Sequence, residues 1–223
     1  MVNIMSSSEH VRNIAVFASG NGSNFGRFLD EEANGNFPGR IVLFVTDKPG
    51  CYAQKRAEEH GIPVFSFSPK DYGSKEEFEQ EILRELAQAG GYWLVLAGYM
   101  RLVGPVLLQA YRGRIVNIHP SLLPAFPGKD AVGQALSYGV KWTGVTVHQV
   151  DEGMDTGPII AQEVVAIAMG DSREALQVRI QAVEHALYPK TVAKLIQWTL
   201  NNMTSNFEVN SVDNKTRIAE RIE

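Results

Sequence analysis

The fold of this chain starts from the stretch Asn13-Ile14-Ala15-Val16-Phe17-Ala18-Ser19-Gly20-Asn21-Gly22-Ser23-Asn24. Its first half is a short apolar run, which predicts a strand, and its second half is a turn of glycines and small polar residues. A helical pattern follows over residues 24–32. A strand that passes through a tight turn into a helix is the first part of a βαβ unit. This stretch therefore predicts a parallel sheet with crossover helices.

The alternation of strand and helix continues along the chain. Further strands are expected over residues 40–46, 64–67, 92–97, 114–119, 143–150 and 158–167. Helices are expected over residues 51–60, 74–89, 105–111, 131–138 and 171–200. This pattern predicts an α/β fold of Rossmann-like type, with a central, mostly parallel twisted sheet and helices on both faces.

No linker or shift in composition divides the chain, so we expect one main domain. Residues 1–10 are interpreted as a flexible N-terminal leader, residues 11–200 as the catalytic domain and residues 201–223 as a C-terminal extension. The S-x-x-E pattern at Ser74–Glu77 is typical of a helix N-terminus, and Gly90-Gly91 should end the same helix. The apolar run Tyr92–Ala97 is typical of a strand buried on both faces.

Composition excludes several classes of protein. Of 223 residues, 44% are hydrophobic and 21% are charged, as in ordinary globular domains. The net charge of -4 argues against a broad electrostatic surface for nucleic acid. No segment approaches the roughly 20 apolar residues that span a bilayer, and the N-terminus lacks the basic region of a secretory signal. The single cysteine, Cys51, fits a reducing compartment, so a cytoplasmic location is expected.

The glycine loop over Ser19–Asn24 is a candidate phosphate site. Glycines there let the backbone approach a ligand, and the start of the following helix offers free N–H groups. The dinucleotide fingerprint fails, because Phe25 stands where a third glycine or alanine belongs. A Walker pattern is also missing. A single phosphate is therefore favoured over a tight turn without a ligand, and both are favoured over a dinucleotide.

A second candidate site lies in the run Asn117-Ile118-His119-Pro120-Ser121-Leu122-Leu123-Pro124. Asn117 and His119 are two residues apart on an expected strand, so their side chains should point to the same face. Taken alone, each is more typical of a turn former or a satisfied polar residue. With Asp155 from a later segment they would combine an amide, an imidazole and a carboxylate, which suits acyl-type transfer.

Several segments carry a family resemblance in their order and spacing. They are Ser19–Asn24, Ala97–Leu102, Asn117–Pro124, Gly144–His148 and Glu184–Pro189. Together they resemble the phosphoribosylglycinamide formyltransferases, folate-dependent formyltransferases of purine synthesis. The resemblance covers residues 11 to about 200. It implies a formyltransferase fold and the transfer of a formyl group from 10-formyltetrahydrofolate, as cosubstrate, to the amine of 5'-phosphoribosylglycinamide (GAR).

The resemblance also implies a role for each matching residue. Asn117, His119 and Asp155 correspond to the catalytic trio. The GAR-binding residues would be Gly22, Ser23, Asn24 and Glu184. The folate-binding residues would be Lys75, Met100, Arg101, Leu102, Val103, Asn117, Asp151, Glu152, Gly153, Met154 and Asp155. Lysine stands at position 75 where the family often has arginine, which keeps the charge but loses the bidentate fork. Leu96 is a further candidate wall of the folate slot, and His148 is interpreted as a residue that braces the site.

Three alternatives remain open from the sequence. A formyltetrahydrofolate hydrolase usually adds an N-terminal regulatory domain, whereas about ten residues precede the first strand here. A methionyl-tRNA formyltransferase would need a further C-terminal domain and a basic surface. A non-catalytic nucleotide-binding module would not need the trio. No ligand-spacing motif supports a metal, and the expected partners are the two small molecules, with neither nucleic acid nor membrane; a homodimer is allowed.

Overall fold

The computed structural model describes residues 10–205, and within this range the strands form a single seven-stranded sheet. The strands are β1 (Asn13–Phe17), β2 (Arg40–Thr46), β3 (Val64–Ser66), β4 (Trp93–Leu96), β5 (Ile115–His119), β6 (Trp142–Gln149) and β7 (Ile159–Ala166). The helices are α2 (Ser23–Ala33), α3 (Tyr52–Glu59), the 3-10 helix η1 (Pro69–Asp71), α4 (Lys75–Ala89), α5 (Pro105–Ala110), α6 (Ala131–Tyr138) and α7 (Arg173–Ser205).

The sheet order is β3-β2-β1-β4-β5-β6-β7. Strands β1 to β5 pair in parallel, whereas β5–β6 and β6–β7 pair in antiparallel fashion. The predicted α/β fold with a mostly parallel sheet is therefore confirmed. The strand order reverses between β1 and β4, and ligands of open α/β sheets bind at such a switch point, beyond the carboxyl ends of the strands.

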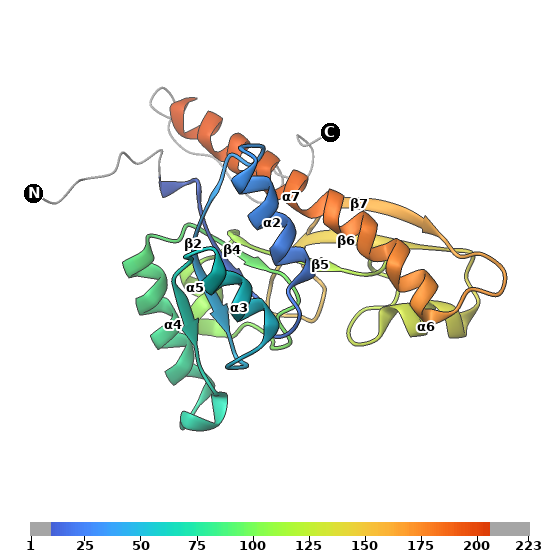
Figure 1. The fold of residues 1–223 in the computed structure, drawn as a ribbon, viewed down its shortest axis with the longest axis horizontal. Coiled ribbons are helices and arrows are strands. Elements are labelled where there is room, and N and C mark those ends of the chain that lie inside the picture. Colours follow the sequence, from blue (N-terminus) through green and yellow to red (C-terminus); the bar gives the residue numbers. More distant parts are fainter. Residues whose placement is uncertain (1–9, 206–223) are drawn as a thin grey trace, which may run out of the picture.

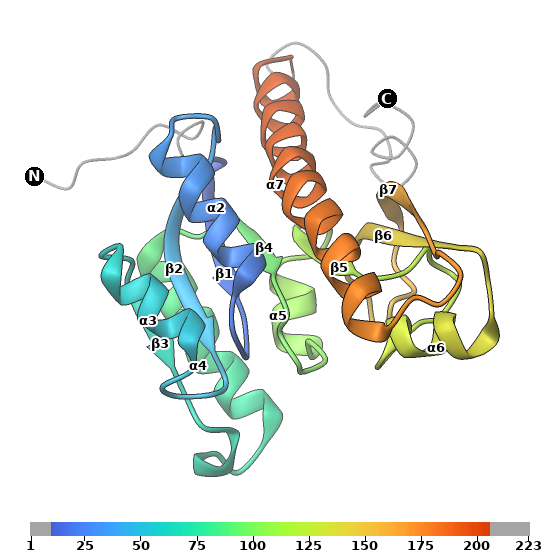
Figure 2. The ribbon, with the colours of Figure 1, turned by 45° about the vertical axis from the view of Figure 1, so that its right-hand side comes forward.

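Helices cover the two faces of the sheet because alternate residues of each strand point to opposite sides. Ile14 and Val16 of β1 belong to one core, together with side chains of α2, α3, α6 and α7. Ala15 and Phe17 belong to the other core, with side chains of α4 and α5. Figure 1 shows α2 and α7 side by side, and in Figure 2 α7 runs from α6 and the last two strands past α2.

The expected elements lie within a few residues of those observed, with two differences. The 3-10 helix η1 was not expected, and α7 ends at Ser205, whereas the sequence analysis ended it near Leu200. The prediction was wrong there because the apolar pattern ends before the helix does: Thr199 and Asn202 still donate to carbonyls four residues back. The N-terminal leader and most of the C-terminal extension lie outside the described residues.

Helix α4 illustrates how local sequence positions these elements. The hydroxyl of Ser74 accepts a hydrogen bond from the backbone N–H of Glu77 (3.2 Å), which is the N-cap that the S-x-x-E pattern predicts. The helix ends at Gly90, whose φ of 68° is readily adopted by glycine. Both ends of α4 are thus set by residues that the sequence analysis used.

Candidate active site

Three polar side chains meet on one face of the sheet, at the junction of β5 and β6. Asn117 and His119 project from β5 on the same side, as their spacing predicts, and His148 of β6 lies directly opposite Asn117 in the antiparallel register. The amide Nδ2 of Asn117 is 3.2 Å from Nε2 of His148. The sheet register therefore brings together residues that are 31 positions apart in the sequence.

Asp155 completes this group from the loop after β6. Its Oδ2 is 3.4 Å from Nδ1 of His119, and its Oδ1 is 3.6 Å from Nε2 of His148. The backbone N–H of Gly128 donates to Oδ2 at 2.7 Å. Asp155 has a φ of 57°, in the left-handed region that few residues other than glycine occupy. The chain accepts this conformation where it turns the carboxylate back toward the two histidines.

Both ring nitrogens of His119 face acceptors. The Nε2–H donates to the carbonyl oxygen of Phe126 (2.9 Å), and Nδ1 faces the carboxylate of Asp155. A neutral imidazole can donate to only one of these groups. The side chain is buried, with 6% of its surface exposed, so an unfilled bond would be poorly replaced by water. The carbonyl of Phe126 and the carboxylate of Asp155 therefore fix the plane and the position of the ring.

The neighbours of His148 favour one tautomer of its neutral ring. Its Nδ1–H donates to the carbonyl of Gln149 (2.8 Å), which leaves Nε2 to accept from the amide of Asn117 in the neutral ring. Burial lowers the pKa of His148 below its usual value, although the Gln149 carbonyl and Asp155 oppose this shift. A neutral His148 therefore fixes the orientation of Asn117, in line with the bracing role expected for it.

The glycine loop lies at the carboxyl end of β1, and its shape depends on Gly22. This residue has a φ of 66°, and a Cβ atom built on it would lie 2.6 Å from the Cβ of Ala53 in α3. Gly22 is the N-cap of α2 and supplies no side-chain cap, so the first N–H groups of the helix keep their capacity to bind an anion. This geometry is compatible with the phosphate site that the sequence predicts, which stays a prediction.

Asn24 and Glu184 join this loop to α7. Nδ2 of Asn24 donates to Oε2 of Glu184 (3.0 Å), and both residues are buried. Burial raises the pKa of Glu184, and the hydrogen bond from Asn24 only partly opposes this. Oδ1 of Asn24 is buried without a partner. The carboxyl group of Glu184 and Oδ1 of Asn24 can both accept hydrogen bonds from a ligand. The hydroxyl and amine groups of a ribonucleotide would be suitable donors.

The segment after β4 presents apolar side chains to the surface. Met100 is 69% exposed and Leu102 is 56% exposed. Leu96 is buried, and Val103 packs against the core formed with α4 and α5. The guanidinium of Arg101 lies over the ring of Phe78, 5.2 Å from its centroid. Met154, on the loop before Asp155, is 50% exposed. Exposed apolar residues on both loops fit a slot for a flat, mostly apolar ligand.

The remaining expected folate residues lie on or near these two loops. Oδ1 of Asp151 accepts hydrogen bonds from the N–H of Gly153 (3.1 Å) and the hydroxyl of Thr156 (2.7 Å), which shapes the 151–155 loop. Glu152 is largely exposed, and its Oε1 lies 3.8 Å from Nη2 of Arg112. Lys75 opens α4, and its Cε would lie 2.6 Å from a Cβ at Gly104, next to the segment after β4. Of these residues, only Lys75 comes from an element remote in sequence.

Ser19, Asp47 and Glu79 support these loops. Ser19 donates to Asp47 (2.5 Å) and accepts from the N–H of Met100, while Glu79 accepts from the N–H of Gly104. Sequence reasoning included Ser19 only as the first residue of the glycine loop, and it did not select Asp47 or Glu79. No local pattern marks Glu79, because its partner is 25 residues away.

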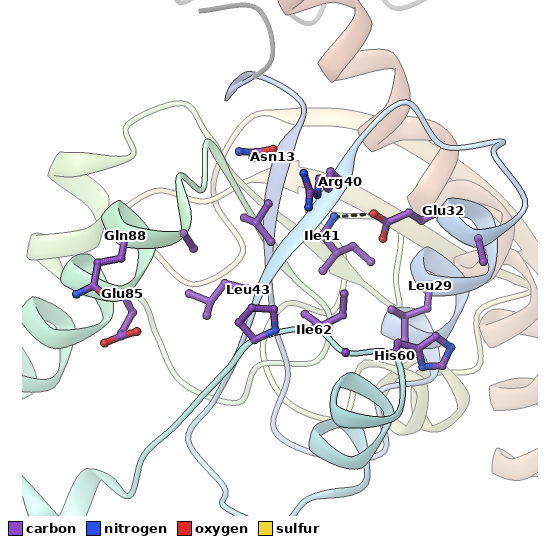
Figure 3. A pocket seen from close by; sticks show the side chains of 15 residues that line it. Asn13, Leu29, Glu32, Arg40, Ile41, Leu43, His60, Ile62, Glu85 and Gln88 are labelled. Carbon is purple, nitrogen blue, oxygen red and sulfur yellow. Dashed lines mark hydrogen bonds between the residues drawn. The ribbon is translucent and has the colours of Figure 1, made fainter. Parts of the chain in front are cut away.

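A large hollow in the described part of the chain lies away from these residues. It has a volume of about 740 Å³ and is lined at the amino ends of the parallel strands, by Asn13, Arg40 and Ile62 among others. Figure 3 shows Glu32 beside it, bonded to the N–H of Ile41. This hollow is at the opposite end of the parallel strands from Asn117, His119 and Asp155, and none of these three residues lines it. Residues 10–205 contain no group of three or more His, Cys, Asp or Glu side chains that could hold a metal.

Comparison with known proteins agrees with this geometry. Residues 12–192 match the formyl transferase family. The chain is 52% identical over 192 residues to the phosphoribosylglycinamide formyltransferase of Bacillus subtilis, covering 86% of this chain and 97% of that protein. It resembles the structure of glycinamide ribonucleotide transformylase 1 from Geobacillus kaustophilus, with 59% identity, a TM-score of 0.81 and coverage of 83% and 98%.

A formyltetrahydrofolate deformylase from Pseudomonas syringae pv. tomato shares the fold at a TM-score of 0.77. It is 28% identical, and the match covers 83% of this chain but 61% of that protein. The transformylases are thus matched at higher identity and over nearly their whole length. No helix among the described residues is long and apolar enough to cross a membrane. On its sequence and its architecture, the chain belongs to the formyl transferase family.

Proposed function

We propose that this protein transfers the formyl group of 10-formyltetrahydrofolate to the amine of GAR, giving formyl-GAR and tetrahydrofolate, as a step of de novo purine (IMP) biosynthesis. The observation that carries this proposal is the group formed by Asn117, His119 and Asp155 between a phosphate-type loop and an apolar slot. The high identity to phosphoribosylglycinamide formyltransferases, over nearly their whole length, supports the acceptor.

The two substrates would bind on either side of His119. Gly22, Ser23 and Asn24 would hold the phosphate and Glu184 the rest of the ribonucleotide, since Asn24 and Glu184 are already bonded. Residues Met100 to Val103 and Asp151 to Asp155 would enclose the folate ring. Lys75 is proposed for the acidic tail of the folate, because it lies beside Gly104 at the end of that slot.

The reaction forms a C–N bond and breaks another. The amine nitrogen of GAR attacks the formyl carbon, and the carbonyl electrons move to the oxygen. One N–H of the Asn117 amide donates to His148. The second N–H would donate to this oxyanion. Collapse of the intermediate breaks the bond to N10 of the folate. The attacking nitrogen loses one proton and N10 gains one, so the net reaction needs no other proton source.

His119 and Asp155 are placed to handle that proton. Asp155 would orient the ring of His119 through Nδ1, and a protonated His119 could donate to the oxyanion or to N10. In this structure Nε2–H of His119 is bonded to the carbonyl of Phe126. The 120–130 loop must therefore release this bond, or the ring must turn, before His119 can donate to a substrate. Phe126 has a φ of 54°, so the loop is held there in a rarely occupied conformation.

A spectrophotometric assay with GAR and 10-formyltetrahydrofolate tests the proposal. The wild type should turn over only when GAR is present, and His119→Ala should lose about 100-fold or more in kcat. His60→Ala is the matched control, because His60 is exposed and lines the hollow at the opposite edge. Folate turnover without GAR would indicate a hydrolase instead, and folate binding without any turnover would mean that the acceptor is a different amine.

Location and assembly are finer proposals. We propose a cytoplasmic enzyme, which is supported by the free thiol of Cys51. A homodimer is proposed as an allowed state, and light scattering of the purified protein would decide it. Neither proposal affects the chemistry above.

A further inference from the structure

The segment Met100–Gly104 is held at its first residue by a buried hydroxyl. The backbone N–H of Met100 donates to Oγ of Ser19 at 2.9 Å, and this hydroxyl donates in turn to Oδ1 of Asp47 at 2.5 Å. Ser19 and Asp47 are both buried. Ser19 is also the first residue of the glycine loop, and its own N–H donates to the carbonyl of Gly98 (3.1 Å). One side chain therefore links the loops after β1, β2 and β4.

The last residue of the same segment is held by a buried carboxyl group. The N–H of Gly104 donates to Oε1 of Glu79, a residue of α4 that is 1% exposed. Burial raises the pKa of Glu79, while the Gly104 N–H and the charge of Lys75 oppose the shift. A Cβ at Gly104 would lie 2.6 Å from Oε2 of Glu79, so the backbone approaches this carboxyl group closely. A side chain at position 104 would displace the carboxyl group of Glu79 from this contact.

Two of the side chains in this segment have little packing of their own. Met100 and Leu102 direct most of their surface to solvent, and the exposed fractions of 69% and 56% are high for such side chains. Val103 packs against the core with Phe78 and Leu107, and Arg101 lies over Phe78. The core therefore holds Val103, whereas the positions of Met100 and Leu102 depend on the backbone and so on the hydrogen bonds at the two ends of the segment.

We propose that Ser19 and Glu79 are positioning residues for the folate cosubstrate. Acting through the backbone of the Met100–Gly104 segment, they fix the wall of the folate slot, and Ser19 also sets this wall relative to the phosphate loop. Neither residue touches the reacting atoms. The inference rests on the proposed function, because it assumes that this segment binds the folate.

Steady-state kinetics with both substrates varied test the proposal. Ser19→Ala leaves the N–H of Met100 without its buried acceptor, so the KM for 10-formyltetrahydrofolate should rise about tenfold while kcat changes little. Glu79→Ala should have the same effect. Glu79→Gln keeps an acceptor oxygen and should restore most of the affinity. Isothermal titration with tetrahydrofolate should show the same order of affinities without turnover.

Asn13→Ala is the matched control. Asn13 is buried at the other end of β1, and its Nδ2 donates to the carbonyl of Gly90 (2.9 Å). Its loss should lower the melting temperature and leave both KM values unchanged. The inference is overturned if Ser19→Ala, which removes a single oxygen and should fold, binds tetrahydrofolate as the wild type does. It is equally overturned if Asn13→Ala weakens folate binding to the same extent.

The outcome also separates this inference from the proposed function. A wild type without GAR-dependent turnover would refute the proposed function, whatever the variants do. A wild type that turns over, with unchanged KM values in Ser19→Ala and Glu79→Ala, would refute only the positioning role.

Discussion

Replacing Gly22 by alanine should destabilise the protein and damage the phosphate loop. Two features of the structure act together at this position. The φ of 66° is a conformation that costs an alanine about 1–2 kcal/mol. The new methyl group would also lie 2.6 Å from Cβ and 3.1 Å from Cα of Ala53, and overpacking of this kind costs about 1–3 kcal/mol.

The two effects sum to roughly 2–5 kcal/mol of lost unfolding free energy. For a protein of this size the melting temperature should fall by about 4–20 °C. Ala53 lies in α3, and its Cα cannot turn aside as a flexible side chain can. The strain is therefore relieved by moving the glycine loop, so the KM for GAR should rise more than the KM for 10-formyltetrahydrofolate.

Gly20→Ala is the control within the same loop. A Cβ at Gly20 would meet nothing within 4 Å, and the φ of Gly20 lies outside the left-handed region. Its unfolding free energy should change by less than about 1 kcal/mol. Urea denaturation and steady-state kinetics of the two variants give the comparison. If Gly22→Ala were as stable as Gly20→Ala, the reasoning from loop geometry would be refuted.

Three further predictions follow from the site. Asp155→Asn should lower kcat by about 100-fold or more, because it removes the carboxylate that faces Nδ1 of His119. The amide oxygen can still accept from the N–H of Gly128, so the melting temperature should be preserved. A kcat near that of the wild type would contradict this role. Glu184→Gln should raise the melting temperature at neutral pH and raise the KM for GAR. Burial raises the pKa of Glu184 in the folded state above its unfolded value, so the folded state binds more protons and its stability falls as pH rises above about 4.5. A Glu184→Gln variant that is less stable than the wild type at pH 7, and whose stability depends on pH as strongly, would count against this. For His148 the folded pKa is lowered, so the unfolded state binds more protons and stability falls on acidification below about pH 6.5. His148→Gln should show a weaker loss over that window in thermal denaturation, and an equal loss would assign it to other groups.

The sequence by itself determined the order and type of nearly all the elements. Apolar runs such as Tyr92–Ala97, the Ser74 cap and the glycine at position 90 are local signals, and the corresponding strand and helix formed where they predicted. Local signals suffice there because burial on both faces and capping are properties of short segments. The limit of this reasoning is visible at α7, where the helix continues beyond its apolar pattern to Ser205.

The spacing of Asn117 and His119 likewise fixed that both side chains share a face. Asp155 entered the candidate site as a carboxylate from a later segment, and the family resemblance matched it to the catalytic trio; Glu184 was added by the resemblance alone. Their contacts with His119 and Asn24 depend on where the loop after β6 and helix α7 pack.

Only the tertiary structure decided which distant groups meet. The antiparallel turn of β6 places His148 opposite Asn117, and no local pattern specifies this register. The bonds of Ser19 and Glu79 to Met100 and Gly104 were not predicted, because these partners are 81 and 25 residues away. A hydrogen bond across such a separation has no sequence period. It exists because the packed sheet and helices bring two backbones to bonding distance, and burial makes an unpaired group there unfavourable.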